Sequence, residues 1–417
     1  MQHQQQAGEP VTVAALRGQT VPTPGSQRLQ GIDAVRGLVM VVMALDHVRD
    51  MLHRGAITGS PTDLATTTPL LFFTRWITHF CAPLFMLTAG IGAYLWWRDG
   101  HSRRELSWFL ATRGLWLVVL ELTVMRFAYN FTVSAQYPLM LLVLWALGLS
   151  MLALAAVAWM PVPVIGGLSL ATIVLHNLLD PIRARQLGDL AGVWNLLHEV
   201  GAFPIAGTVA IVGYPLVPWV AVMALGFALG PLFARRSEAR QRTLLAGGLG
   251  AVLAFVALRG LASYGDPVRW VQMHSAAYTA MAFINTTKYP PSLAFLLMTL
   301  GPGLLLLAWF ERLHLAPTHP LVVLGRVPLF YFVAHFYAAH ATAALLALVR
   351  YGSAAWSFIF HPVPTMGGPA ALYPRDFGYD LWVTYLAWAG IVVALYPACR
   401  WFAGVKARRR DWWLRYL

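Results

Sequence analysis

The chain has 417 residues, of which 58% are hydrophobic and 11% are charged; soluble domains have about 25% charged residues, so the composition excludes an ordinary soluble protein and predicts a polytopic membrane protein. The formal net charge of +13 does not indicate a nucleic-acid partner, because the basic residues lie mainly at the ends of apolar runs, where topology signals are found. The apolar runs are continuous over about 20 residues, which favours helices over the alternating strands of a membrane β-barrel.

The first element is a polar stretch, residues 1–27, which lacks the apolar segment of a signal peptide; we predict a disordered cytoplasmic tail. Residues 28–402 are predicted to form a single transmembrane domain, and 403–417 a basic cytoplasmic tail. The two cysteines, Cys81 and Cys399, lie in separate apolar runs, which argues against a disulfide framework or a thiolate metal site. No metal is expected.

The apolar runs predict an all-α transmembrane bundle of about ten spans, with a range of nine to eleven. We place the spans at 32–52, 69–97, 108–131, 138–160, 162–180, 208–233, 243–264, 290–310, 320–349 and 380–402. Alternate connections carry most of the basic residues, so both termini are predicted to be cytoplasmic and the longest loops to lie outside.

Two connections attract further predictions. The segment 181–207 is a candidate for a re-entrant piece, from Trp194 to Ile205, which is one reason for the range in span number. The loop 351–379 contains several Pro, Gly and Tyr residues and is expected to be ordered and to fold over a site.

The first span is unusual because it carries many ionisable residues. They are Asp33, Arg36, Asp46, His47, Arg49, Asp50 and His53. Each charge near the bilayer centre costs about 2.5–3.5 kcal/mol on insertion scales, so such residues are functional candidates by default. In the predicted topology Asp33 and Arg36 lie near the cytoplasmic end, and His47 and Asp50 near the outer end.

The spacing within this span separates two roles. Arg36 precedes His47 by three helical turns, or about 16 Å, so the two side chains cannot act on one atom. Arg36, with Asp33, is predicted to bind an anionic, phosphate-bearing donor from the cytoplasmic side. His47 is predicted to act as a general base, held by Asp50 one turn later.

Polar residues of other spans share the depth of His47. Arg75 and His79 lie in the outer half of the second span and are predicted to join the catalytic site. The residues predicted to bind or support an acceptor are Asp63, Asn285, Lys288 and His335.

Structural interpretations of the same residues remain open. Arg36 and Asp33 would form a purely structural pair, and Arg75 would pair with Glu121. His335 and His340 would each be satisfied core histidines.

Several stretches resemble one family. Residues 28–37, Arg-Leu-Gln-Gly-Ile-Asp-Ala-Val-Arg-Gly, resemble the opening of the heparan-α-glucosaminide N-acetyltransferase catalytic domain family and its bacterial relatives. Further likeness lies in Thr62–Gly90, Leu144–Ser150, Asn285–Leu293 and Leu324–His335. The spacing of Arg36 and His47 also resembles the Arg–His motif in the first helix of the broader membrane acyltransferase superfamily.

The resemblance implies that 28–402 is an acyltransferase-like domain that uses cytosolic acetyl-CoA, or another acyl-CoA, to acylate a sugar amine or hydroxyl of a glycan at the outer side of the membrane. It also implies an active-site histidine, acting as general base or as transient acetyl carrier. The functional histidine of the lysosomal enzymes falls in the loop after the first helix, and the nearest one here, His53, does not match it cleanly. His47 as general base follows the superfamily motif instead.

Other interpretations compete with an enzyme. Buried Arg and His residues also suit a transporter or flippase of a lipid-linked or anionic solute, and pairs such as His47 and His79, or His335 and His340, are conceivable haem ligands. Membrane lipids are expected partners, and a homodimer is left open. The abundance of Arg and Ala over Lys suggests a GC-rich bacterial genome and hence the inner (plasma) membrane.

Overall fold

The computed structural model describes residues 24–55, 59–134, 137–235, 237–362, 365, 368–409 and 411–417. In the first half the helices are α1 (Pro24–Leu52), α3 (Pro69–Trp76), α4 (Cys81–Arg98), α5 (Arg103–Leu120), α6 (Arg126–Asn130), α7 (Val143–Val157), α8 (Val162–Leu175) and α9 (Ala191–Leu197). In the second half they are α10 (Leu216–Leu229), α11 (Ser237–Leu261), α12 (Ala276–Ile284), α13 (Leu293–Arg312), α14 (Pro320–Arg326), α15 (Pro328–Tyr351) and α16 (Leu381–Arg408).

Short segments of other helical type extend or join these helices. The 3₁₀ segments are η2 (Ile77–Phe80), η4 (His176–Leu179), η5 (Ala184–Gln186), η6 (Gly188–Leu190), η7 (Gly230–Ala234), η8 (Gly352–Ser357), η10 (Ala370–Leu372) and η11 (Trp412–Arg415), and η3 (Glu121–Met125) is π-helical. As a result α3, η2 and α4 form one continuous helical stretch, and α5, η3 and α6 form another.

The prediction of an all-α polytopic bundle is confirmed. Eight described helical stretches are long and apolar enough to cross a membrane: Pro69–Arg98, Arg103–Asn130, Val162–Leu179, Leu216–Ala234, Ser237–Leu261, Leu293–Arg312, Pro328–Ser357 and Leu381–Arg408. The two other predicted spans correspond to α7, which is apolar but has 15 residues, and to α1, which has 29 residues and carries the charges noted above. The cytoplasmic placement of both termini stays a prediction.

Three predicted spans have different boundaries. Spans 138–160 and 208–233 each begin as a β-strand rather than as helix. Span 320–349 is divided into α14 and α15 at Val327, whose φ of −127° and ψ of 46° lie outside the helical region. Pro328 explains this break, because its ring disfavours helical geometry in the residue before it.

A small sheet lies among the helices. It consists of β1 (Leu139–Leu141), β3 (Thr208–Val212) and β2 (Gly201–Ile205) in that order, with β1 parallel and β2 antiparallel to β3. The predicted re-entrant piece is therefore α9 followed by β2, which forms a hairpin with β3. Ala206 and Gly207 both have positive φ, 47° and 77°, as a two-residue hairpin turn requires.

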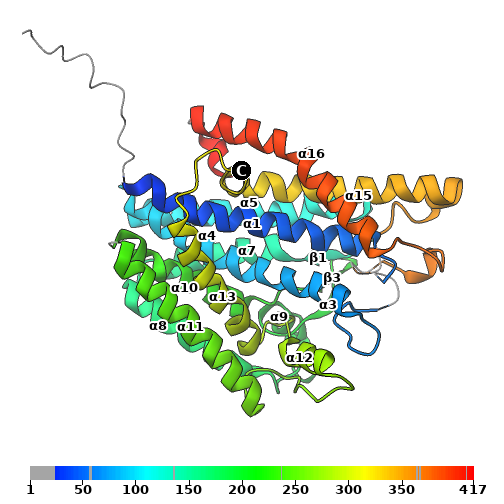
Figure 1. The fold of residues 1–417 in the computed structure, drawn as a ribbon, viewed down its shortest axis with the longest axis horizontal. Coiled ribbons are helices and arrows are strands. Elements are labelled where there is room, and N and C mark those ends of the chain that lie inside the picture. Colours follow the sequence, from blue (N-terminus) through cyan, green and yellow to red (C-terminus); the bar gives the residue numbers. More distant parts are fainter. Residues whose placement is uncertain are drawn as a thin grey trace, which may run out of the picture.

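The elements gather unevenly along the bundle. Figure 1 shows α1, α4, α5 and α7 running beside one another, while α3, β1 and β3 lie to the right of them and α9 and α12 lie below, near the middle.

Helix α1 packs very closely against α14. A Cβ added to Gly37 would lie 1.8 Å from the carbonyl oxygen of Leu321, and one added to Gly325 would lie 1.8 Å from that of Asp33. Glycine at both positions lets the two backbones touch. This contact places Arg326 of α14 3.6 Å from the Asp33 carboxylate.

The predicted terminal tails differ from the structure where they are described. Helix α1 begins at Pro24, inside the predicted disordered tail, and residues 1–23 lie outside the described residues. At the other end α16 continues to Arg408, and residues 411–417 pack back onto α5. There the hydroxyls of Tyr416 and Thr112 lie 2.9 Å apart, and Arg113 donates to the carbonyl of Arg415 at 2.7 Å.

Candidate active site

A cavity of about 690 Å³ opens among the elements of the bundle. We call it the His47 cavity. Its polar lining includes Asp46, His47, Arg49, Asp50, Ser60, Thr62, Arg75, His79, Asn285, Thr286, Thr287, Lys288 and Tyr289. The cavity thus brings together residues of α1, of the second predicted span and of the segment before α13.

His47 is paired with His335 of α15. The Nδ1 of His47 lies 2.6 Å from the Nε2 of His335, and the Nδ1 of His335 lies 2.9 Å from the carbonyl oxygen of Tyr331. A carbonyl can only accept, so the Nδ1 of His335 carries a proton and its Nε2, in the neutral ring, accepts. His47 then donates from Nδ1, which leaves its own Nε2 with a lone pair. His335 therefore fixes the tautomer in which His47 can take up a proton.

The predicted pairing of His47 with Asp50 is wrong. Arg49 pairs with Asp50, and also with Asp46 at 2.9 Å. Arg75 pairs with Asp46 as well. Among the described residues no hydrogen bond joins Asp50 to His47. Asp50 lines the cavity as a partner of Arg49, and the support expected from it comes from His335 on another helix.

His79 faces the same cavity with an unused nitrogen. It is 3% exposed, and within the described residues its Nδ1 has no hydrogen-bond partner. Buried polar atoms are nearly always hydrogen-bonded, so this nitrogen, itself hardly exposed, leaves His79 with one hydrogen bond still to be made. Asp63, in contrast, does not line the cavity; it closes an exposed turn by accepting from the amide of Ala65 and the hydroxyl of Thr66.

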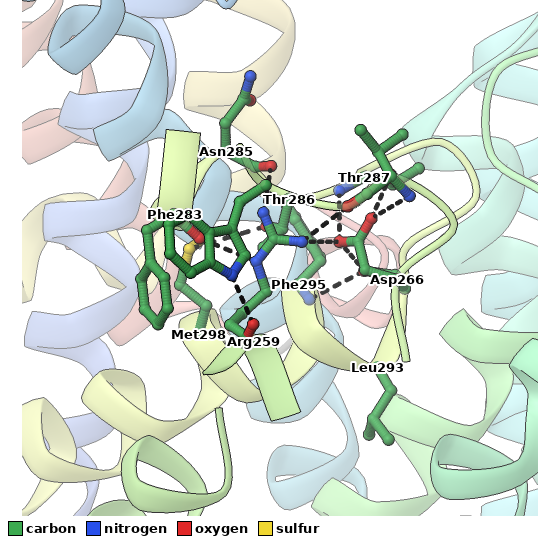
Figure 2. A network of polar contacts seen from close by, with 12 residues as sticks. Arg259, Asp266, Phe283, Asn285, Thr286, Thr287, Leu293, Phe295 and Met298 are labelled. Atoms are coloured by element: carbon green, nitrogen blue, oxygen red, sulfur yellow. Dashed lines mark hydrogen bonds and ion pairs between the residues drawn. The ribbon is translucent and has the colours of Figure 1, made fainter. Parts of the chain in front are cut away.

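The segment 285–292 forms another wall and is held by a polar network, shown in Figure 2. Arg259, buried in α11, donates to the carbonyls of Ala282, Phe283 and Asn285 at the end of α12. Those carbonyls have lost their helical partners, so Arg259 caps α12.

Asp266 binds the other side of the same segment. It accepts from the amide and the hydroxyl of Thr287 at 3.0 and 2.9 Å, and from the hydroxyl of Ser292 at 3.0 Å. Its carboxylate also lies 3.7 Å from Arg259. The side-chain amide of Asn285 donates to the backbone carbonyl of Thr62 at 2.9 Å. This bond connects the segment to the rim of the cavity.

The side chains of Lys288 and Tyr289 are left facing the cavity. Arg75 donates to the Tyr289 hydroxyl at 3.4 Å. Desolvation raises the pKa of that hydroxyl, but the charges of Lys288 and Arg75 outweigh this effect and bring its pKa below its ordinary value. This corner of the cavity is therefore electropositive.

A second cavity, of about 260 Å³, contains Arg36; we call it the Arg36 cavity. It is mostly apolar, with Arg36 and Arg113 as its charged residues and Trp96 and Phe109 among its aromatic walls. Val143 and Phe332 line both cavities. The two cavities thus adjoin at the start of α7 and on α15, with these two side chains between them.

Asp33 is placed behind Arg36 rather than in the cavity wall. It lies 3.6 Å from the Arg36 guanidinium, which also donates to the carbonyl of Thr88 at 2.6 Å. Asp33 and Thr88 therefore orient Arg36, so the structural pair and the predicted binding role are compatible. A Cβ on Gly92 would lie 2.8 Å from the Arg36 guanidinium, so glycine leaves room for this side chain.

The roles of two polar residues, the half-buried Arg113 and the buried Glu121, were missed or misjudged from sequence. Arg113 was hidden inside an apolar run, with only its charge as a signal. Glu121 does not pair with Arg75; it accepts from the Tyr129 hydroxyl at 2.5 Å and from the amides of Leu144 and Trp145 at 2.7 and 3.1 Å. Glu121 therefore caps α7 just where the two cavities meet.

These contacts do not favour His335 and His340 as a pair of haem ligands. Both nitrogens of His335 are engaged, by His47 and by Tyr331, and the Nδ1 of His340 bonds to the carbonyl of Ala128 at 2.7 Å. His340 is thus a satisfied core histidine. Among the described residues no group of three or more His, Cys, Asp or Glu side chains could hold a metal ion.

Comparison with known families agrees with the geometry. The model of the heparan-α-glucosaminide N-acetyltransferase catalytic family matches residues 28–264, more than half of the chain. No curated protein matches it. The matched region holds Arg36, His47, Arg75, His79 and Arg113, and leaves out the segments that supply Lys288 and His335. The chain therefore belongs to the heparan-α-glucosaminide N-acetyltransferase catalytic family and is a multi-pass membrane enzyme of the acetyltransferase type.

Proposed function

We propose that the enzyme moves an acyl group from acyl-CoA, in the first place acetyl-CoA, to an amine or hydroxyl of a sugar or glycan. The observation that carries the proposal is the junction of two cavities, with two guanidinium groups in one and an oriented histidine in the other. Val143 and Phe332 border both spaces, and we propose that the arm of one extended donor passes between these two side chains from Arg36 to His47.

The Arg36 cavity suits the donor. Coenzyme A carries several phosphate charges at one end and a thioester at the end of a long, thin arm. Guanidinium groups bind phosphate with paired hydrogen bonds, which gives Arg36 and Arg113 their proposed role. The apolar walls around them suit the arm, and the thioester would then lie near the junction with the His47 cavity.

The His47 cavity suits the chemistry. The acceptor nitrogen or oxygen attacks the thioester carbonyl carbon while the Nε2 of His47 removes its proton. The C–S bond then breaks, the acyl group stays on the acceptor, and the thiolate of coenzyme A takes the proton from His47. General-base assistance of this kind contributes about 10²–10⁴-fold to rate. The free Nδ1 of His79 is proposed to orient the acceptor or the thioester oxygen, with Arg75 as its charged neighbour.

The two ends imply a direction across the membrane. With both termini in the cytoplasm, the Arg36 cavity faces the cytosolic donor and the His47 cavity faces the acceptor outside. The inner (plasma) membrane of a bacterium is the proposed location, because donor and acceptor then lie on opposite sides of one membrane.

The proposal is tested by measuring release of free coenzyme A from acetyl-CoA by detergent-purified protein, with glucosamine and other amino sugars as trial acceptors. We expect acceptor-dependent release that falls by about 10²-fold or more in His47→Ala. The variant should still fold, with a lower melting temperature because the buried His335 loses its donor. His340→Ala is a control for removing a buried imidazole outside the cavity. Full turnover in His47→Ala would refute the catalytic role of His47, and intact solute uptake into proteoliposomes without acyl transfer would favour a transporter.

A further inference from the structure

Lys288 stands out among the cations of the His47 cavity. It is 8% exposed, yet it makes no ion pair with a carboxylate in the described part of the chain. Its Nζ atom lies over the ring of Tyr289, 5.1 Å from the ring centroid. Arg49 and Arg75, in contrast, are both bonded to aspartates.

The charges around the cavity leave one positive charge uncompensated. Asp46 and Asp50 are the carboxylates in its lining, and Arg49, Arg75 and Lys288 are the cations. The ion pairs engage both carboxylates with the two arginines. Lys288 acts on Asp46 only as a third and weaker charge, after Arg75 and Arg49. A buried net positive charge is unfavourable, so a bound molecule with a negative group would complete the balance.

The segment that carries Lys288 is held rigidly for such a task. Asp266 engages Thr287 and Ser292, and Arg259 engages the carbonyl of Asn285 (Figure 2). His176 adds a contact at 2.8 Å from its Nε2 to the carbonyl of Pro291. These bonds occupy the backbone and the small side chains, whereas the Lys288 ammonium remains toward the cavity. A site built in this way is pre-organised.

We propose that Lys288 forms an anion-binding subsite for a carboxylate, sulfate or phosphate group of the acceptor, with the Tyr289 hydroxyl as a second donor. That hydroxyl accepts from Arg75 and keeps its own hydrogen to donate. The inference rests on the proposed function for calling the bound molecule an acceptor. Acidic amino sugars would then make a contact with Lys288 that neutral amino sugars lack.

A binding experiment tests the subsite without any turnover. The melting temperature of the detergent-purified full chain is followed as sodium sulfate or sodium phosphate is added, against sodium chloride at equal ionic strength. We expect the oxyanions to raise it more in the wild type and in Lys288→Arg than in Lys288→Met, in which the Arg36 cavity still binds them. The exposed Arg269, which precedes α12, supplies the control Arg269→Met, expected to respond like the wild type.

Equal stabilisation of the wild type and Lys288→Met would overturn the subsite. If Lys288→Met does not fold, Tyr289→Phe decides instead: an unchanged response to the oxyanions would then count against the site. The comparison is meaningful even if no acyl transfer is found, so a failure of the proposed function is distinguishable from a failure of the subsite.

Kinetics then assign the anion to the acceptor. Glucosamine, glucosamine 6-sulfate and glucosamine 6-phosphate are compared as acceptors with acetyl-CoA. We expect Lys288→Met to raise the KM of the two acidic sugars by about tenfold or more, corresponding to about one broken charge contact, while kcat and the KM of glucosamine change little. A fall in kcat with all three sugars and no change in KM would overturn the assignment. So would Lys288-dependent stabilisation by phosphatidylglycerol in nanodiscs with none by the sugar acids.

Discussion

The two cavities differ in how their charges are balanced. In the Arg36 cavity, two guanidinium groups face largely apolar walls, and the counter-ion nearest to Arg36 is Asp33, 3.6 Å away. In the His47 cavity, aspartates and arginines are bonded to one another, and one lysine is left over. The first arrangement suits the binding of a highly charged molecule, because Arg36 shares Asp33 with Arg326 and Arg113 has no carboxylate partner among the described residues. The second suits chemistry, because its groups are held in fixed positions.

This comparison also separates the roles of two buried pairs. Asp33 orients Arg36 from behind and leaves the cavity face of the guanidinium free for a ligand. His335 orients His47 through a direct bond and leaves one nitrogen free for a proton. Both supporting residues lie on or against α1, which is therefore the helix that connects donor binding with catalysis.

Among the tests of how the two cavities differ, the largest expected effect is a fall in kcat when His335 is replaced. In His335→Phe the ring of His47 loses its acceptor, so we expect kcat to fall by about 10–100-fold with little change in the KM of acetyl-CoA. In His335→Gln the side-chain carbonyl can still accept from His47, so part of the activity should return. Steady-state kinetics of coenzyme A release measure both. Equal losses in the two variants would show that His335 acts by packing and not by fixing a tautomer.

A smaller effect, on binding alone, is expected at the other cavity. Arg36→Met and Arg113→Met each remove one phosphate contact, so we expect each to raise the KM of acetyl-CoA by about tenfold, roughly one charge-assisted hydrogen bond. The value of kcat should change little, because neither side chain lines the His47 cavity. Isothermal titration with coenzyme A and with pantetheine supplies the check: the variants should lose affinity for coenzyme A and keep that for pantetheine. Unchanged affinity for coenzyme A in these variants would contradict the assignment of the Arg36 cavity to phosphate binding.

The smallest expected effect concerns the junction between the cavities. Glu121→Gln keeps the size of the side chain but removes the charge that receives three hydrogen bonds, so we expect a loss of about 1 kcal/mol and a fall of a few degrees in melting temperature. Activity of the folded fraction should remain. Differential scanning fluorimetry and coenzyme A release on the same samples separate the two. A large loss of kcat with an unchanged melting temperature would give Glu121 a role in the reaction.

Much of this arrangement follows from the sequence. The length of the apolar runs predicts the helices, and a common depth in the membrane predicts that His47, Arg75, His79 and Lys288 meet. Both inferences depend on properties that each segment carries by itself. The strands β1 to β3 escape such reasoning because they are three to five residues long and adjoin apolar helices.

What the sequence could not show were pairings between segments. His47 has Asp50 one turn away, yet it bonds to a histidine 288 positions later, because Arg49 captures Asp50 first. Glu121 could face Arg75 by depth alone, but its carboxylate instead accepts from the amides at the start of α7, which have no partner within that helix. In both cases the residue that forms the bond is close in the folded structure, but a single sequence does not show which of several polar residues will be the partner.

The central claim is that one donor molecule extends from Arg36 through the junction to His47. A structure of the full chain with a non-transferable thioether analogue of acetyl-CoA tests it most directly. We predict the phosphates of the analogue beside Arg36 and Arg113, its arm between Val143 and Phe332, and its acyl end next to His47. Phosphates bound in the His47 cavity, or an analogue that leaves the Arg36 cavity empty, would contradict the account.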